Sequence, residues 1–209
     1  MTNLFEVLIF LCWSMVLIYL LVGSTYRLSL LGVFTSPLVF IFQIFAMLAP
    51  IDTPGVVKPP PNPWVSMHAA ISMVAYGAFA LACVAGVMYL VQERQLKTRQ
   101  LRSFFYDLPP IADLSVVITR LLILGFALLS IGLVAVVEGE KRPEVSGNLL
   151  HLAKALWPVG VWMFYAAILA AKIWRRLSPR RLAMAAVAAF VVALTTLWGL
   201  NFISDKVHF

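Results

Sequence analysis

The stretch Trp64-Val-Ser-Met-His68, with the apolar run that follows it as far as Tyr89-Leu-Val-Gln-Glu93-Arg94, decides the fold. No charged residue occurs in residues 66–91, and a helix needs only about 20 apolar residues to cross the hydrocarbon core of a bilayer. A proline-rich segment, residues 50–63, precedes the run and marks the start of the helix. The sequence therefore predicts a membrane-spanning helix over residues 66–91, with His68 in its first turn.

The composition of the whole chain is that of an integral membrane protein. Of 209 residues, 62% are hydrophobic and 12% are charged, and the mean hydropathy is +0.95; soluble domains average about 25% charged residues. We therefore interpret the net charge of +7 as a signal of membrane topology and expect no nucleic-acid partner. Residues 1–6 lack a basic segment, so we expect no cleavable signal peptide. Cys12 and Cys83 lie in apolar runs and form no CxxC motif, which disfavours thiol–disulfide exchange by this chain alone.

Six apolar runs of about spanning length predict an all-α, polytopic membrane protein with a single transmembrane domain over residues 1–209. The predicted helices cover residues 4–22, 31–49, 66–91, 115–137, 149–173 and 181–204. The sixth run is rich in alanine and valine, a composition that allows close packing against neighbouring helices.

Lysine and arginine are distributed unequally between the two sides of the predicted bundle. One side holds 11 of the 16 basic residues and the other side holds five. The positive-inside rule assigns the richer side to the cytoplasm, so both chain termini are predicted to be external. In this topology the three histidines of the chain, His68, His151 and His208, all lie at the external face.

Two histidines on separate helices at one membrane surface can serve as the axial ligands of a haem. Position alone leaves other interpretations open. His68 can also be an interfacial residue bonded to a loop carbonyl, and His208 can belong to a solvated tail. His151 shares their side and is a weaker candidate for a ligand.

Aromatic and basic side chains near these histidines also have two interpretations. Trp157 and Trp162 are five residues apart and cannot share one helix face exactly, although Pro158 can bring them nearer. They can flank a flat hydrophobic ligand or pack within the bundle. Trp64 and Trp157 fall near the outer interface, where tryptophan anchors helices. Lys154 follows His151 by one turn and can snorkel outward or meet a carboxylate such as a haem propionate. The sequence shows no nucleophile triad, phosphate loop or paired intramembrane acids, so we predict no catalytic residue.

Four segments carry a resemblance to a known family, in the order in which that family has them. They are Asn3-Leu-Phe-Glu6 with Trp13, Trp64-Val-Ser-Met-His68 with Ser72 and Tyr76, Leu108-Pro-Pro-Ile with Arg120 and Gly125-Phe126, and Gly199-Leu-Asn201 with His208. Together they resemble the motifs of the CcsA-type cytochrome c assembly proteins, which are relatives of the CcmC haem-handling proteins and of HemX. The resemblance covers essentially the whole chain.

The resemblance implies a function in cytochrome c biogenesis. It implies that His68 and His208 are the external axial ligands of a haem b held for delivery to apocytochrome c, and that Trp64, Lys154, Trp157 and Trp162 line the site. It also implies a bacterial inner (cytoplasmic) membrane location, a ResB- or CcsB-type membrane partner and a thioredoxin-like reductant. On this interpretation the chain is part of a haem-attachment (holocytochrome c synthase) complex and is not an enzyme alone.

The chain departs from the family pattern in two places, and these departures support alternatives. The family's tryptophan-rich segment is largely replaced, and of it only Lys154, Trp157 and Trp162 stay in register. The intramembrane histidine of the family's next helix corresponds to Ala170. A HemX-like membrane regulator of tetrapyrrole synthesis is therefore the first alternative. A non-catalytic subunit of a larger membrane complex, with incidental histidines, is the second.

Overall fold

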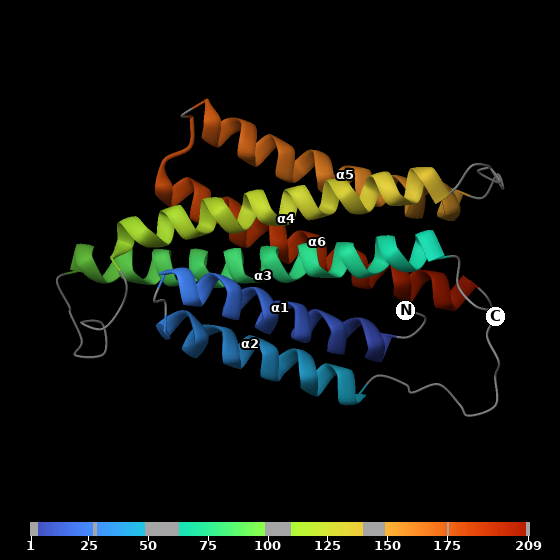
Figure 1. The fold of residues 1–209 in the computed structure, drawn as a ribbon, viewed down its shortest axis with the longest axis horizontal. Helices are drawn as coiled ribbons and strands as arrows, with labels where there is room; N and C mark the ends of the chain where they lie inside the picture. The colour runs from blue at the N-terminus through green and yellow to red at the C-terminus, as the bar shows by residue number, and fades with distance from the viewer. Residues whose placement is uncertain are drawn as a thin grey trace.

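Six helices run alternately up and down in the computed structural model of the protein (Figure 1). The structure describes residues 4–26, 29–48, 63–98, 110–139, 149–174 and 176–207. The helices are α1 (Leu4–Tyr26), α2 (Ser29–Leu48), α3 (Pro63–Thr98), α4 (Ile111–Gly139), α5 (Leu149–Ile173) and α6 (Pro179–Val207). The described residues contain no strand, which confirms the prediction of an all-α protein.

Helix α3 is the centre of the bundle and has the most extensive contacts, above all with α4 and then with α6, α1 and α2. In Figure 1, α1 and α2 lie on one side of α3, and α4 and α5 lie on the other. Residues 75–86 of α3 are buried without interruption, and most of them are alanine, glycine or other small residues. Small residues let helix backbones approach closely, which is the main source of helix association inside a membrane.

Two glycines show how close these approaches are. A Cβ atom on Gly77 of α3 would lie 2.9 Å from the Cβ of Ser14 on α1. A Cβ atom on Gly125 of α4 would lie 2.5 Å from the ring of Phe79 on α3, closer than real Cβ atoms come to any neighbour. Glycine is therefore required at both positions for α1 and α4 to pack against α3 as they do.

The helices extend beyond the apolar runs because polar residues continue them. α3 has 36 residues; Pro63 opens it, and the i,i+4 pair of Glu93 and Lys97, 2.8 Å apart, supports its last turns. The Oε2 atom of Glu93 also lies 3.4 Å from Nε of Arg180 in the first turn of α6. These charges tie the end of α3 to the start of α6 at the predicted cytoplasmic end of the bundle.

The protein is a multi-pass membrane protein. Within the described residues, five helices are long and apolar enough to cross a membrane: Phe5–Gly23, Leu31–Leu48, Pro63–Thr98, Ile111–Ala135 and Leu156–Ile173. The predicted sixth span, residues 181–204, lies in α6, whose side chains the structure describes only as far as residue 195. Both cysteines, Cys12 and Cys83, are buried and free.

Candidate functional site

His68 is held by a hydrogen bond from α3 to α4. Its Nδ1 atom lies 2.7 Å from the carbonyl oxygen of Gly132, and the side chain is half-buried. A carbonyl only accepts hydrogen bonds, so Nδ1 carries the proton, and in the neutral ring Nε2 keeps its lone pair. Metal-binding histidines commonly have this arrangement, in which one ring nitrogen donates to a backbone carbonyl and the other binds the metal. The acceptor belongs to a helix and not to a loop.

Gly132 and Ser72 shape the surroundings of this hydrogen bond. A Cβ atom on Gly132 would lie 3.0 Å from Oγ of Ser72 and 3.7 Å from Nδ1 of His68. The absence of a side chain at Gly132 therefore lets α4 come close enough for its carbonyl to reach the imidazole. Ser72 lies one turn after His68 on α3, and its Oγ is buried without a hydrogen-bond partner among the residues that the structure describes. Sequence reasoning missed Gly132 as a partner of His68.

Trp64 precedes His68 by one turn on α3, and its side chain is 47% exposed. Residues four apart on a helix lie on the same face, so the indole and the imidazole are neighbours on α3. An exposed indole at this end of the bundle is available both to the membrane interface and to a flat ligand beside His68.

Trp157 and Trp162 on α5 face different helices, as their spacing indicates. Nε1 of Trp162 donates a hydrogen bond to Oγ of Ser130 on α4, at 2.8 Å. Its ring also stacks on Phe126, with the ring centroids 5.3 Å apart. Trp157 lies beside the hydroxyl of Tyr76 on α3, but its Nε1 is buried, and no described residue offers it an acceptor at hydrogen-bonding geometry. Trp162 thus fastens α5 to α4 through Ser130 and Phe126, whereas Trp157 faces α3 at Tyr76, two turns after His68.

The remaining predicted site residues are placed only in part. His151 and Lys154 lie in the first turns of α5, which begins at the same end of the bundle as α3 (Figure 1). The structure does not describe their side chains. His208 lies outside the described residues and follows Val207, the last residue of α6, which ends at that same end of the bundle. The structure therefore brings together His68, Trp64 and Gly132, and it does not test the predicted pairing of His68 with His208.

A line of buried polar groups continues from His68 into the bundle, and sequence analysis noted two of them, Ser72 and Tyr76, only as parts of a family motif. Ser72 and Tyr76 follow His68 at intervals of one turn on α3. Tyr165 on α5 is fully buried and stacks on Phe79 with ring centroids 3.7 Å apart. Its hydroxyl has no hydrogen-bond partner within the described part of the chain. Buried polar groups are rarely unpaired. The i,i+4 spacing of polar residues along α3 is the sequence signal that could have revealed this line.

Fold and site together define the class of the protein: a polytopic helical membrane protein with a histidine, hydrogen-bonded through Nδ1 to a neighbouring helix, at the end where α1, α3 and α5 begin. Comparison with known proteins identifies the family. The chain belongs to the family of cytochrome c assembly proteins, whose family model matches residues 1–208. This match confirms the resemblance found in the four sequence segments.

Curated relatives are similar over nearly the full length of the chain. The cytochrome c biogenesis protein CcsA of Porphyra purpurea is 25% identical over 248 residues, which cover 100% of this chain and 77% of the relative. The protein of the same name from Gloeobacter violaceus is 24% identical and covers 99% of this chain and 77% of its own length. The CcsA protein of Prochlorococcus marinus subsp. pastoris is 27% identical, and the similarity covers 99% of this chain and 73% of the relative. No solved structure is significantly similar to the chain.

Proposed function

We propose that the protein holds haem b at the external face of a bacterial cytoplasmic membrane and presents it to apocytochrome c. Membership of the cytochrome c assembly family supports the general role. The single observation that carries the proposal is the hydrogen bond from Nδ1 of His68 to Gly132, because it orients the ring and leaves Nε2 as the nitrogen that would bind iron. The charge distribution supports the external location of this end of the bundle.

In this proposal each residue near His68 has a defined task. His208, beyond the end of α6, supplies the second axial ligand, and His151 is the weaker candidate for the same position. Lys154 meets a propionate, and the indoles of Trp64, Trp157 and Trp162 line the apolar ring. A bound haem would supply two kinds of chemistry. Its iron would bind two imidazoles, and its vinyl groups would react with the thiols of apocytochrome c. The protein's own residues bind and orient it.

The protein acts in this proposal as one part of a haem-attachment complex. A ResB- or CcsB-type membrane protein is the expected partner, and a thioredoxin-like protein keeps the thiols of apocytochrome c reduced. The candidate site contributes binding and orientation, with no catalytic side chain of its own.

The deciding experiment is a pyridine haemochrome assay and a reduced-minus-oxidised spectrum of the purified full-length protein. His68→Ala and His208→Ala are each expected to lose most of a b-type spectrum. His151→Ala is compared with them: it keeps the spectrum if His208 supplies the second ligand and loses it if His151 does. Cytochrome c maturation in cells is measured in parallel. Wild-type protein without haem, from cells with ample haem, would refute direct binding.

Ala170 favours a second candidate function. It lies on α5 at the position where the resemblance places a histidine in the membrane-spanning part of related proteins. A chain without that ligand fits a HemX-like membrane regulator of tetrapyrrole synthesis. Deletion of the gene distinguishes the two functions: the regulator changes the level of tetrapyrrole precursors, whereas the assembly protein changes the level of mature cytochrome c. A non-catalytic subunit would copurify with its complex in fixed stoichiometry and without haem.

A further inference from the structure

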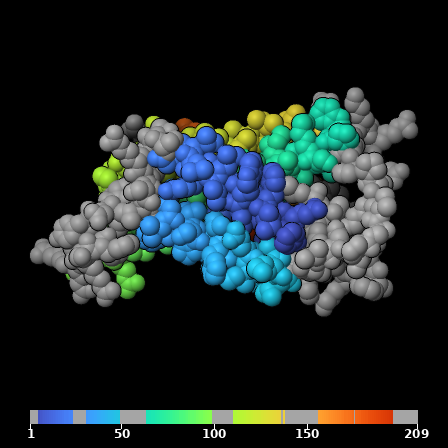
Figure 2. All heavy atoms as spheres, turned by 60° about the horizontal axis from the view of Figure 1, so that its bottom comes forward, coloured from blue at the N-terminus to red at the C-terminus, as the bar shows by residue number. Residues whose placement is uncertain are grey.

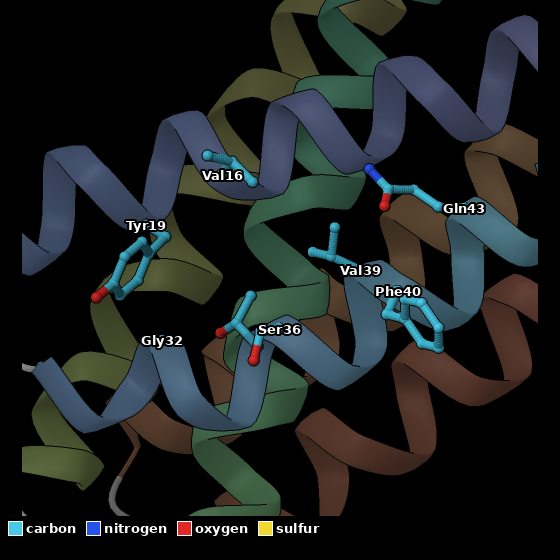
Figure 3. A pocket seen from close by; sticks show the side chains of 8 residues that line it. Val16, Tyr19, Gly32, Ser36, Val39, Phe40 and Gln43 are labelled. Carbon is cyan, nitrogen blue, oxygen red and sulfur yellow. The ribbon is translucent and has the colours of Figure 1, made fainter.

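A groove lies between α1 and α2, on the face of the protein that these two helices form (Figure 2). Its volume is about 470 Å³. Figure 3 shows Tyr19 and Val16 of α1 on one side of the groove and Ser36, Val39, Phe40 and Gln43 of α2 on the other. Gly32 and Thr35 complete the lining. Both helices belong to membrane spans, so the groove opens toward the lipid.

Gln43 is the unusual residue of this groove. It lies five residues before Leu48, the end of its span, and so about 7.5 Å inside the apolar region at 1.5 Å per residue. Its side chain is exposed, and within the described part of the chain its amide has no hydrogen-bond partner. The hydroxyls of Thr35 and Ser36 differ, because they bond to the carbonyls of Leu31 and Val33 of their own helix. An amide facing hydrocarbon without a partner is costly, and such groups in membrane proteins usually meet another polar group.

Gln43 belongs to a stripe of exposed residues along α2, and the spacing of this stripe is that of residues at the contact between two packed helices. The stripe consists of Val33, Ser36, Phe40, Gln43 and Met47, and all five side chains are exposed. The spacing alternates between three and four residues, which is the heptad repeat of helices that pack side by side. Ser36 and Gln43 stand one heptad apart, so both would face the same partner helix.

We propose that this stripe is a dimer interface that packs against α2 of a second copy of this chain. Two copies inserted in one membrane have the same orientation, so a two-fold axis along the membrane normal brings the two stripes together in parallel and at equal depth. An amide side chain both donates and accepts, so the two Gln43 side chains satisfy each other across the axis. The small Ser36 lets the helices approach, and the groove beside the stripe offers room for the Phe40 ring of the second copy.

The chemistry of Gln43 favours this occupant over lipid. An acyl chain has no hydrogen-bonding group at this depth and would leave the amide unpaired. A helix of a different protein would need a polar residue at the matching depth, which a second copy supplies by symmetry. The proposal does not depend on haem binding, because the stripe lies on α2 and the candidate site lies between α3 and α4.

Cysteine cross-linking of the full-length protein in native membranes tests the interface. Ser36→Cys and Gln43→Cys are expected to form disulfide-linked dimers on mild oxidation, whereas Val134→Cys, on the exposed surface of α4, is expected to stay monomeric. The unmodified chain, with both natural cysteines buried, is the background control. Cross-linking through position 134 as readily as through position 43, or cross-linking of position 43 to a different protein, would overturn the proposal.

Amide variants test the role of Gln43 directly. Single-molecule photobleaching in liposomes measures the fraction of dimers as the protein is diluted in lipid. Gln43→Leu is expected to weaken association about fivefold, a typical effect for one hydrogen bond between membrane helices. Gln43→Asn keeps the amide and is expected to retain most of the association. A wild-type chain that is monomeric at all densities would refute the interface, as would equal association of the leucine variant.

Discussion

The Nδ1 atom of His68 lies 2.7 Å from the carbonyl oxygen of Gly132, a residue 64 positions later in the chain. This contact joins the first turns of α3 to the last turns of α4, the pair of helices with the most extensive packing in the bundle. It determines which nitrogen of the ring is protonated, and it fixes the direction of the other nitrogen. His68 is therefore positioned by the fold before any ligand arrives.

Gly132→Ala is expected to disturb this positioning. The added methyl group would lie 3.0 Å from Oγ of Ser72, so α4 or the serine must shift. We expect a lower melting temperature and a severalfold loss of copurified haem. Ser72→Ala removes the hydroxyl that the new methyl group would meet. The double variant Gly132→Ala with Ser72→Ala is therefore expected to regain the melting temperature and the haem content of the wild type. Ser72→Ala alone removes an unpaired buried hydroxyl and is expected to be neutral or stabilising by up to about 1 kcal/mol.

These variants are compared by thermal unfolding in detergent and by haem content. If Gly132→Ala retained both the stability and the haem of the wild type, the methyl group would be accommodated, and a glycine would not be required for the contact between His68 and the carbonyl at position 132. If adding Ser72→Ala did not restore the stability of the Gly132→Ala variant, the methyl group would clash with a residue other than Ser72.

Gly125→Ala tests the packing at the centre of the bundle. Its methyl group would lie 2.5 Å from the ring of Phe79, which is itself stacked on Tyr165 and has little room to move. We expect a destabilisation of about 1–3 kcal/mol, the usual range for overpacking. Gly160→Ala is the matched control, because nothing lies within 4 Å of the added atom. Equal melting temperatures for the two variants would contradict the close approach of α4 to α3.

The sequence was sufficient to predict the number and nature of the helices, because uninterrupted apolar runs long enough to cross a bilayer have few other structures open to them. It could not predict their full lengths. Polar residues such as Glu93 and Lys97 extend α3 through a side-chain pair that hydropathy does not register. The sequence also could not show that α3 is the central helix, because all the helices are apolar. The only indication was the row of small residues between Ala75 and Gly86, which allows close helix packing.

The candidate site was predictable in its individual residues and not in its contacts. The position of His68 after Trp64 was visible in the sequence, but its partner Gly132 lies 64 residues away and contributes only a backbone carbonyl, which no side-chain pattern reveals. The spacing of Trp157 and Trp162 correctly indicated different faces. It could not indicate that Trp162 bonds to Ser130, because that contact depends on how α4 and α5 pack.

The orientation predicted from charge can be tested with reporter fusions. A reporter placed after Thr98, at the end of α3, is expected to be cytoplasmic, because Arg94 and Lys97 precede it. A reporter placed after Gly139, at the end of α4, is expected to be external. Alkaline phosphatase should then be active only in the second fusion, and green fluorescent protein should be bright only in the first. The reverse pattern would place His68 on the cytoplasmic side and exclude delivery to an external apocytochrome c.

Trp162→Phe and Trp64→Phe together distinguish packing from ligand contact. Trp162 bonds to Ser130 and stacks on Phe126, so its replacement by phenylalanine keeps the stacking, loses one hydrogen bond and is expected to cost about 1 kcal/mol of stability. Trp64 is half-exposed, so its replacement is expected to lower the melting temperature less than the replacement of Trp162 does. If the indoles also touch haem, both variants shift the Soret band of the purified protein, because the ring environment of the haem changes. A stability loss at Trp162 with an unchanged Soret band would assign that residue to helix packing alone. An unchanged band for Trp64→Phe would remove Trp64 from the site.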